Sequence, residues 1–511
     1  MRVLLAHAAV HTPLEQARSV LIDGERVLAL DASESEAEAV IDLRGRAVVP
    51  AFVDAHGHLL AFAASLMSVD CRGAKDMADL QSRIRAVAER TPAGEWIRAY
   101  GYDENDLTEG RHPTRSDLDG AAPDHPVRLA HRGGHAVVLN TLALRRCGVD
   151  TEIAEPAGAY VDREVPSGEP SGLFFEMGDV LDARIPPISP AEMDLALAQA
   201  EVALLRAGVA AFHDCGARNG PGEWESLSRL SSERDFRPRL VAASGWPAWS
   251  EGYDIRELAP AVAGSHVKLM LSELGDDVAP DADELSERVA RVHAAGHDVA
   301  IHAVTARGVR AAVDAIDRAL ALHPRRDHRH RIEHASICSP ELMPRMAALG
   351  ITVVSQPAFI YANGERYLRT VPPADLPNLY AFGSMAEAGV HLAFGSDCPF
   401  GRVEPLIGLR SAYERRAANG AVLCGRPMWP AAALAASTLG AARAAGIEDE
   451  HGWIRPGARA DLVGLSKAPE SREAQIEAVL ISGRVVAGRA SLVERLETFL
   501  PIDTQKAGVL W

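Results

Sequence analysis

Cysteine is scarce in this 511-residue sequence, and none of its six cysteines stands in a C-x-x-C pair. We therefore expect neither a disulfide framework nor a thiolate zinc site, and we interpret the cysteines as reduced thiols. Long hydrophobic runs are also missing, because no segment approaches the unbroken apolar length of a membrane span. The first residues, MRVLLAHAAVHTPLEQ, do not have the form of a signal peptide. These absences predict a cytoplasmic protein with no membrane partner.

Positive charge is in deficit. The sequence has 53 lysines and arginines against 70 aspartates and glutamates, and its net charge is -17. This balance argues against a nucleic-acid partner, because phosphate binding needs clustered Lys and Arg. The remaining composition, with 47% hydrophobic and 24% charged residues, is typical of a soluble globular protein. The length is sufficient for one large enzyme domain with an accessory domain.

The middle of the chain alternates short Val/Ile/Ala-rich runs with longer Ala/Leu/Arg/Glu stretches of helical period. This alternation is typical of parallel strands joined by crossover helices. Eight such strands predict an α/β fold, a (β/α)₈ TIM barrel. The eight runs are AVVPAFVDAH (47–56), GVAAFHDCG (208–216), PRLVAASG (238–245), HVKLML (266–271), HDVAIHAV (297–304), RHRIEHAS (329–336), ITVVSQP (351–357) and VHLAFGSD (390–397).

The two chain ends have a different pattern, with short apolar runs separated by glycine turns. The segments VLIDGERVLAL near the start and VLISGRVVAGR near the end each suggest a strand, a glycine turn and a second strand. We therefore predict a small β-sandwich domain built from residues 1–46 and 447–511, and a barrel domain built from 47–68 and 200–446. The segment 69–199 is too long for one barrel connection, and we predict an inserted α+β subdomain near the barrel mouth.

Polar residues gather at the ends of the predicted strands, where barrel enzymes build their active sites. His56 and His58, in FVDAHGHLL, point the same way from one strand end because side chains alternate along a strand. Neutral imidazole and carboxylate are good ligands for Zn²⁺ and similar ions, and two ions need about six donors and a bridge. The other candidates at strand ends or within a strand are Lys268, His302, His334 and Asp397.

Lys268 is the unusual member of this set because an ammonium group repels metal ions. A lysine with a lowered pKa can react with CO₂ to form a carbamate, which offers two anionic oxygens to two ions; burial and nearby cations would favour the neutral amine this needs. An ordinary lysine in an ion pair is an equally good interpretation of the residue taken alone.

A group of motifs makes the resemblance specific: FVDAHGH, VKLM, AIHAV, HRIEHAS, SQPAF and FGSDCP, with GGHAVVLNTLAL and EPSGLFFE in the predicted insertion. Over nearly the whole chain, the sequence resembles the amidohydrolase superfamily, and most closely its YtcJ-like (amidohydrolase-3 type) metal-dependent hydrolases. The resemblance implies that His56 and His58 bind one metal ion, that carboxylated Lys268 bridges, and that His302 and His334 bind a second ion. Asp397 is then both ligand and general base. The implied cofactors are two divalent ions, zinc as the first choice.

Four further residues are candidates for contact with substrate, two from the resemblance and two from their positions after predicted strands. His135 and Glu176 match polar positions of the family's insertion, Gln356 follows the seventh strand, and Arg402 lies on the loop after the eighth. Two motifs depart from the family pattern. HAVTARG stands where relatives have a sequence like HAIGDRA, and MLSELGD follows Lys268 where F-A-D-G-S-L-G is usual. The ligands survive both changes, but the neighbouring substrate contacts are expected to differ.

The predicted function is hydrolysis of a C-N bond, in an amide, N-acyl or N-formyl group of a small molecule, by a metal-activated hydroxide with Asp397 as general base and acid. A mononuclear deaminase is a rival hypothesis, although His302 is followed by Ala303, Val304 and Thr305 and not by the glutamate that deaminases place there. An ester or lactone hydrolase is a second rival hypothesis, and a non-catalytic binding protein is a third. A homodimer is the family-like expectation.

Overall fold

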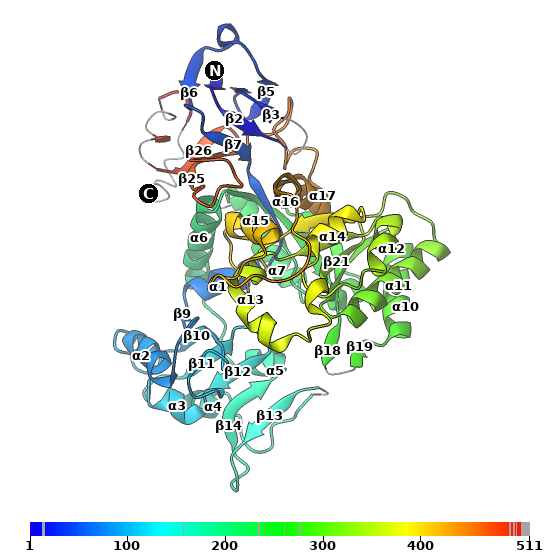
Figure 1. Cartoon of the computed structure of the whole chain (residues 1–511). Helices are drawn as coiled ribbons and strands as arrows, with labels where there is room; N and C mark the ends of the chain where they lie inside the picture. The colour runs from blue at the N-terminus through cyan, green and yellow to red at the C-terminus, as the bar shows by residue number, and fades with distance from the viewer. Residues whose placement is uncertain are drawn as a thin grey trace. The chain divides into compact units, whose positions relative to one another are not determined.

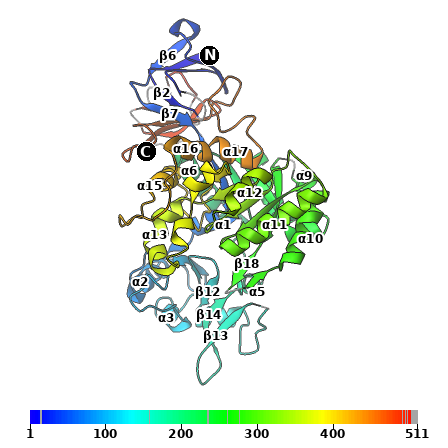
Figure 2. The same cartoon turned by 45° about the vertical axis from the view of Figure 1, so that its right-hand side comes forward.

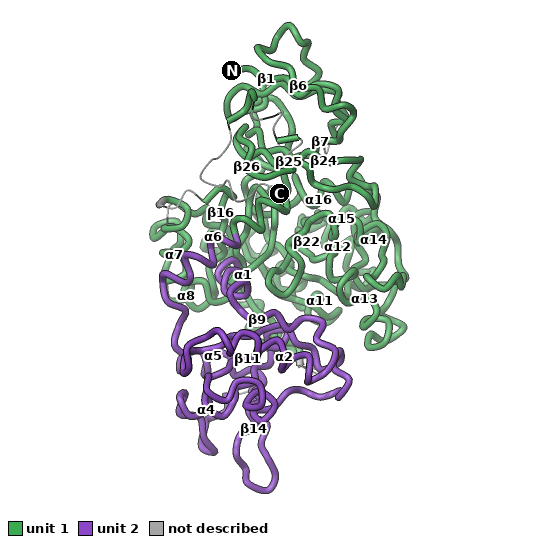
Figure 3. Tube along the Cα trace, turned by 90° about the vertical axis from the view of Figure 1, so that its left-hand side faces the viewer, with its two compact units in different colours: residues 1–58, 201–511 green, residues 59–200 purple. Residues whose placement is uncertain are grey.

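The computed structural model describes residues 1–12, 16–156, 158–233, 236–259, 261–274, 277–489, 492–493, 496 and 498–501. The chain forms two compact units (Figure 3). One contains Met1–His58 and Glu201–Trp511, and the other contains Leu59–Ala200. No helix of the described residues is long and apolar enough to cross a membrane.

The larger unit contains an eight-stranded sheet in which every neighbouring pair of strands is parallel. Each of the eight predicted runs overlaps one of these strands, so the predicted barrel is confirmed. In sheet order the strands are β8 (Phe52–Gly57), β15 (Val209–Asp214), β16 (Arg239–Gly245), β17 (Ala263–Met270), β20 (Asp298–Ala303), β21 (Arg331–His334), β22 (Thr352–Ser355) and β23 (His391–Phe394).

The first and last barrel strands are joined by hydrogen bonds just beyond the end of β23. The Asp397 N–H donates to the carbonyl of His56 at 2.7 Å, and the His58 N–H donates to the carbonyl of Cys398 at 2.9 Å. Gly395 makes this close approach possible, because a Cβ atom there would lie 2.5 Å from the backbone nitrogen of His56. The seam therefore brings three predicted metal ligands together.

Helices cover the barrel, and α10, α11 and α12 lie side by side (Figures 1 and 2). α11 shows why: Val309, Ala312, Val313 and Ile316 are buried at helical spacing, so the helix has one apolar face to pack inwards. The helices of this unit are α7 (Pro221–Glu233), α8 (Trp246–Ser250), α9 (Ile255–Leu258), α10 (Ala282–Ala294), α11 (Ala306–Leu322), α12 (Leu342–Leu349), α13 (Ala358–Thr370), α14 (Phe382–Glu387), α15 (Pro405–Glu414), α16 (Pro430–Ser437), α17 (Leu439–Ala445), η1 (Glu34–Glu36) and η2 (Leu376–Asn378), while α6 (Pro190–Arg206) crosses the boundary between units.

Strands from both chain ends form two further sheets with a shared core that includes Val3, Ile22, Val48 and Leu462. Both sheets belong to the same compact unit as the barrel, so a separate β-sandwich domain stays a prediction. The first sheet has the order β5 (Arg26–Leu30), β4 (Val20–Asp23), β1 (Arg2–Ala6), β6 (Ala39–Asp42); the second has β26 (Arg484–Gly488), β25 (Ile476–Ile481), β24 (Leu462–Leu465), β7 (Ala47–Pro50), β2 (Ala9–His11), β3 (Gln16–Ala17).

The run predicted as one barrel strand, residues 47–56, is in fact two strands. Its first half is β7, which pairs with β24 and β2 in the second end sheet. Its second half is the barrel strand β8, and the Ala51 N–H between them donates to the carbonyl of Asp461. The barrel therefore begins at residue 52, five residues later than the sequence suggested.

The second unit is built on a six-stranded sheet with two apolar clusters around it. Its bounds, Leu59–Ala200, extend the predicted insertion of residues 69–199 at its start. The sheet order is β13 (Tyr160–Arg163), β14 (Pro170–Phe175), β12 (Ala136–Leu139), β11 (Val127–His131), β10 (Ile97–Tyr102), β9 (Val69–Asp70), and the helices are α1 (Leu59–Leu66), α2 (Met77–Ala88), α3 (Arg115–Asp119), α4 (Thr141–Arg146) and α5 (Gly178–Asp182). A hairpin of the larger unit, β18 (Ser272–Leu274) and β19 (Asp277–Ala279), follows β17.

Two buried histidines beside the barrel strands are joined by a hydrogen bond. Nε2 of His293 donates to the carbonyl of His323 at 2.6 Å, so its Nδ1 can accept from Nε2 of His330 at 2.8 Å. Nδ1 of His330 then accepts from the Val299 N–H at 3.1 Å. Protonating His330 would remove this last acceptor, so the arrangement requires the neutral ring.

We expect His330, together with His266, a buried residue of β17, to make stability depend on pH. Burial lowers the pKa of His266 to about 4 and that of His330 to about 2. Below about pH 6.5 the unfolded chain binds a proton at each ring and the folded chain does not, so acidification favours unfolding. From pH 6.5 down to about 4, each histidine should therefore lower the free energy of unfolding by about 1.4 kcal/mol per pH unit.

Urea unfolding of metal-free protein between pH 6.5 and 5.0 tests this expectation. His330→Gln should show a pH slope shallower than that of the wild type by about 1.4 kcal/mol per pH unit. His391→Gln, at an exposed position, is the control and should keep the wild-type slope. An unchanged slope in His330→Gln would contradict the prediction.

Candidate metal centre

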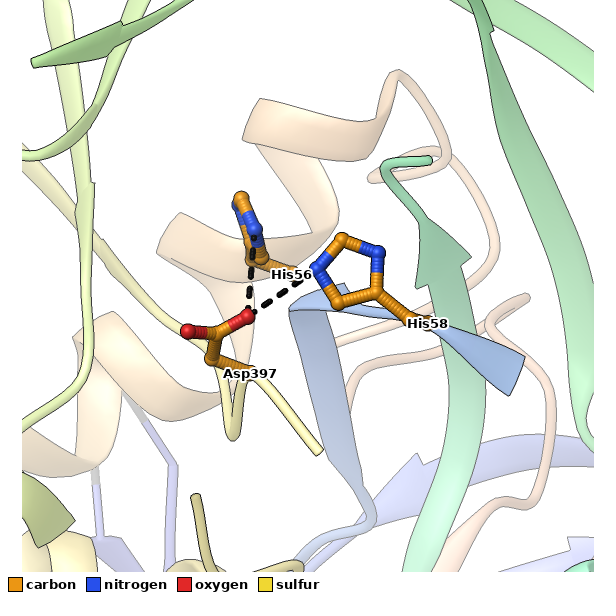
Figure 4. Close-up of side chains that lie close together, drawn as sticks. All are labelled: His56, His58 and Asp397. Carbon is orange, nitrogen blue, oxygen red and sulfur yellow. Dashed lines mark hydrogen bonds and ion pairs between the residues drawn. The ribbon is translucent and has the colours of Figure 1, made fainter. Parts of the chain in front are cut away.

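Three predicted ligands meet at the seam between the first and last barrel strands. His56 lies in β8, His58 follows its end, and Asp397 follows β23. Nε2 of His58 lies 3.1 Å from Oδ1 of Asp397, and Nε2 of His56 lies 3.5 Å from the same oxygen (Figure 4). Their donor atoms are close enough to hold one ion together. Two imidazole nitrogens and a carboxylate form a ligand set that suits a divalent ion.

The other three predicted ligands lie in the same cluster. The ring centroids of His56 and His334 are 4.9 Å apart, and those of His334 and His302 are 4.5 Å apart. Lys268 is buried in β17, and its charge contributes to lowering the pKa of all three histidines. The structure thus brings together all six residues that the sequence selected from distant positions.

Hydrogen bonds on Nδ1 hold two of the imidazoles in a defined orientation. Nδ1 of His334 donates to Oε1 of Gln356 at 2.7 Å, and Nδ1 of His56 donates to Oε2 of Glu333. Burial lowers the pKa of both rings, that of His56 to about 3, so both are neutral at pH 7. A neutral ring with its proton on Nδ1 presents the Nε2 lone pair, which is the state that binds a metal ion. These residues therefore fit a divalent cation.

Asp397 is an anion held in an unusual backbone conformation. Burial opposes its ionisation, but the hydrogen bond with His58 and the neighbouring imidazoles bring its pKa below the usual value. Its φ is +56°, and that of His334 is +70°, both in the left-handed region that non-glycine residues rarely adopt. Such conformations persist where the surroundings enforce them, and they often mark functional sites.

Glu333 and Arg331 are site residues that the sequence reasoning did not select. Both are fully buried in β21, and Glu333 contacts the predicted ligand His56. The available signal was the pair of charges two positions apart in RHRIEHAS, since a buried charge is rare unless it is paired.

Each residue predicted to contact substrate has a hydrogen-bond partner in the structure. Gln356 is fully buried, and its Oε1 accepts from Nδ1 of His334. Arg402 pairs with Glu404 at 2.8 Å on the loop after β23. His135 and Glu176 belong to the other compact unit and bind each other, with Nδ1 and Oε1 2.8 Å apart. Within the larger unit, Gln356 contacts a predicted metal ligand, and substrate contact by the four residues stays a prediction.

The two segments that depart from the family pattern contact each other. The carboxylate of Glu273, in the segment after Lys268, accepts hydrogen bonds from the backbone N–H groups of Val304 and Thr305 at 2.6 and 2.8 Å. It also binds the hydroxyl of Thr305, whose Oγ1 in turn caps α11 by accepting from the Gly308 N–H. Lys268 lies in β17 and His302 lies in β20. The segments that follow these two strands are therefore joined by the hydrogen bonds of Glu273.

Comparison with known proteins supports the predicted family. A model described as "Amidohydrolase family" matches residues 39–487. The chain is 25% identical to the putative amidohydrolase YtcJ of Bacillus subtilis (strain 168) over 88% of this chain and 89% of that one. It is 27% identical to N-substituted formamide deformylase of Arthrobacter pascens over 91% of this chain and 94% of that one.

A solved structure shares the fold. An uncharacterized metal-dependent hydrolase from Pyrococcus furiosus aligns with a TM-score of 0.70 at 24% identity, and the alignment covers 92% of this chain and all of that one. At this level of identity the likeness supports the architecture and not a particular substrate.

Proposed function

The chain belongs to the amidohydrolase family, and from this premise we propose that it hydrolyses a C-N bond of a small molecule, in an amide, N-acyl or N-formyl group. The observation that carries the proposal is the convergence of two imidazoles on one carboxylate oxygen. Nε2 of His58 lies 3.1 Å from Oδ1 of Asp397, and Nε2 of His56 lies 3.5 Å from the same atom. The name of the Arthrobacter relative, N-substituted formamide deformylase, supports the choice of bond.

Two groups of side chains would hold the cofactor. His56, His58 and Asp397 would bind one divalent ion, and His302 and His334 would bind a second. When bound, such ions polarise the scissile carbonyl and lower the pKa of water enough for hydroxide to form near neutral pH. Zinc is our first choice, and histidine with carboxylate also suits manganese, iron and cobalt.

Asp397 moves the proton in the proposed reaction. It is ionised at pH 7, so its free Oδ can take a proton from the attacking water as the water oxygen bonds to the carbonyl carbon. When the C-N bond breaks, the protonated carboxyl gives that proton to the leaving nitrogen. One side chain thus serves as base and then as acid, and the products are an amine and a carboxylic acid, which loses its remaining proton to solvent at neutral pH.

Charge balance supports a carbamate on Lys268. Among the described residues around the cluster, Lys268 and Arg331 carry positive charge, and Glu333 and Asp397 carry negative charge. Asp54, whose pKa burial raises to about 6, adds one further carboxylate. Carboxylation of Lys268 changes its charge from +1 to -1, which shifts this buried set toward a balance that favours two divalent cations.

Metal removal is the direct test of the proposed function. We expect protein purified with bicarbonate and without chelator to hydrolyse members of a panel of N-formyl and N-acyl amines. Dialysis against a chelator should lower kcat/KM at least about 100-fold, because the ions supply several kcal/mol of transition-state stabilisation. Zinc, manganese or cobalt added back should restore activity, with metal content followed by plasma mass spectrometry.

The panel should also contain aryl esters, lactones and aminopurines. Metal-dependent turnover of these compounds with none of the amides would contradict the C-N hydrolase and favour an esterase or a deaminase. No metal uptake and no turnover of any compound would contradict an enzyme of this class.

A further inference from the structure

We infer that Glu333 is a positioning residue that fixes His56 for metal binding, and that Arg331 holds Glu333 in place. The inference rests on the proposed function, since it assigns a role around a metal ligand. His56, Glu333 and Arg331 form a continuous buried chain, and each is at most 1% exposed. Barrel strands are usually apolar on both faces, so two buried charges in one short strand call for an explanation.

Glu333 uses both of its oxygens. Oε2 accepts from Nδ1 of His56, while Oε1 accepts from Nε of Arg331 at 2.5 Å. A second guanidinium nitrogen of Arg331 lies 3.2 Å from Oε2, so the two side chains form a fork-shaped pair. The geometry leaves Glu333 one orientation, and in that orientation it faces His56.

Arg331 is itself fixed by backbone groups of other elements. It donates to the carbonyl of Ala55 in β8 at 3.0 Å and to the carbonyl of Ala444 in α17 at 3.1 Å. It also donates to Nδ1 of His213 at 2.9 Å, so Nε2 of His213 carries the proton and donates to Oγ of Ser265 at 2.7 Å. The guanidinium is thus anchored to strands and a helix that build the barrel.

A carboxylate can only accept hydrogen bonds, and this fact selects the tautomer of His56. Facing Glu333, Nδ1 must carry the proton, which leaves the Nε2 lone pair on the side of Asp397. A glutamine in place of Glu333 could present either its oxygen or its amide hydrogens. It would therefore no longer enforce one tautomer, and it would remove a negative charge from beside the cation site.

The first test is Glu333→Gln, measured by the zinc dissociation constant in competition with a chromogenic chelator. We expect affinity to fall about 10- to 100-fold, the range typical of lost hydrogen-bond partners of metal-ligating histidines. Cobalt-substituted protein should show a changed visible absorption spectrum as well. Glu341→Gln is the matched control, because Glu341 pairs with Arg310 on the surface, and its affinity should equal that of the wild type.

A double variant separates metal positioning from folding. Glu333→Gln leaves the Arg331 charge buried without its partner, which can destabilise the protein by itself. Arg331→Met with Glu333→Gln removes both charges at once, and we expect this variant to fold but still to bind zinc weakly. Wild-type affinity in the folded double variant would overturn the inference, since Glu333 would then serve only to neutralise Arg331.

The inference and the proposed function can fail separately. If wild-type protein binds no zinc, cobalt or manganese, the proposed function fails before the variants matter. If the wild type binds metal and both variants bind it equally well with unchanged cobalt spectra, only the role of Glu333 is overturned.

Discussion

Replacing Lys268 with alanine is expected to lower the metal content from about two ions per chain to about one and to lower kcat/KM about 10³-fold or more, because the loss of a bridged pair removes several kcal/mol of transition-state stabilisation. Lys268 is 2% exposed, and its charge acts on His56, His302 and His334. Only a carboxylated side chain at this position could attract cations to both groups of histidines. Alanine offers no ligand atom in its place.

Two comparisons sharpen this prediction. Lys268→Met keeps most of the buried volume without an amine, so it should match the alanine variant in metal content while retaining more stability. Lys467→Ala removes an exposed lysine that pairs with Glu473 and should leave both metal content and activity unchanged. Plasma mass spectrometry gives the ion count, and wild-type protein prepared without CO₂ should resemble the variants.

An unchanged ion count in Lys268→Ala would contradict the carbamate bridge. A content of one ion in both wild type and variant would point to a mononuclear centre, while the triad of His56, His58 and Asp397 could still hold that ion. Lys268 would then be an ordinary buried cation, and its charge would be balanced by Glu333 and Asp397.

The barrel could be predicted from sequence because its strands are short apolar runs separated by segments of helical period. The candidate ligands could be predicted because most of them stand at the ends of those runs. The proximity of His56, His334 and Asp397 could be predicted without any distances, because the carboxyl ends of the parallel strands of a barrel meet at one face. The split of residues 47–56 could not be seen in the same way. β7 and β8 form one apolar run, and only pairing with β24, some 400 positions away, separates them.

Other features depended on contacts that no local pattern encodes. Glu333 lies one position before His334, and its function as a hydrogen-bond partner depends on His56, 277 residues earlier. Gln356 was selected because it follows a strand, and its hydrogen bond with His334 could not be predicted from that position. The role of each of these side chains depends on which hydrogen-bond partners lie beside it in the buried cluster, and only the folded chain brings those partners together.

Replacing Asp397 with asparagine should preserve the fold and nearly abolish catalysis. Asparagine has the same shape and tolerates the left-handed backbone at φ +56°, so the seam bond from its N–H to the His56 carbonyl is kept. It cannot take a proton from water, and general base and acid catalysis contributes about 10²- to 10⁴-fold. We therefore expect kcat to fall by about that factor, measured with the best substrate of the N-formyl and N-acyl panel.

Two further variants separate charge from conformation. Asp397→Ala forces a residue with a Cβ and no polar group into the same left-handed backbone, which costs about 1 kcal/mol or more, so its melting temperature should lie below that of Asp397→Asn. Asp283→Asn removes a carboxylate that is 97% exposed, and it should match the wild type in kcat and in melting temperature. Because Asp397 is also a proposed ligand, metal content must be measured on every sample; an Asp397→Asn protein that holds full metal and keeps wild-type kcat would remove Asp397 from the proton transfer.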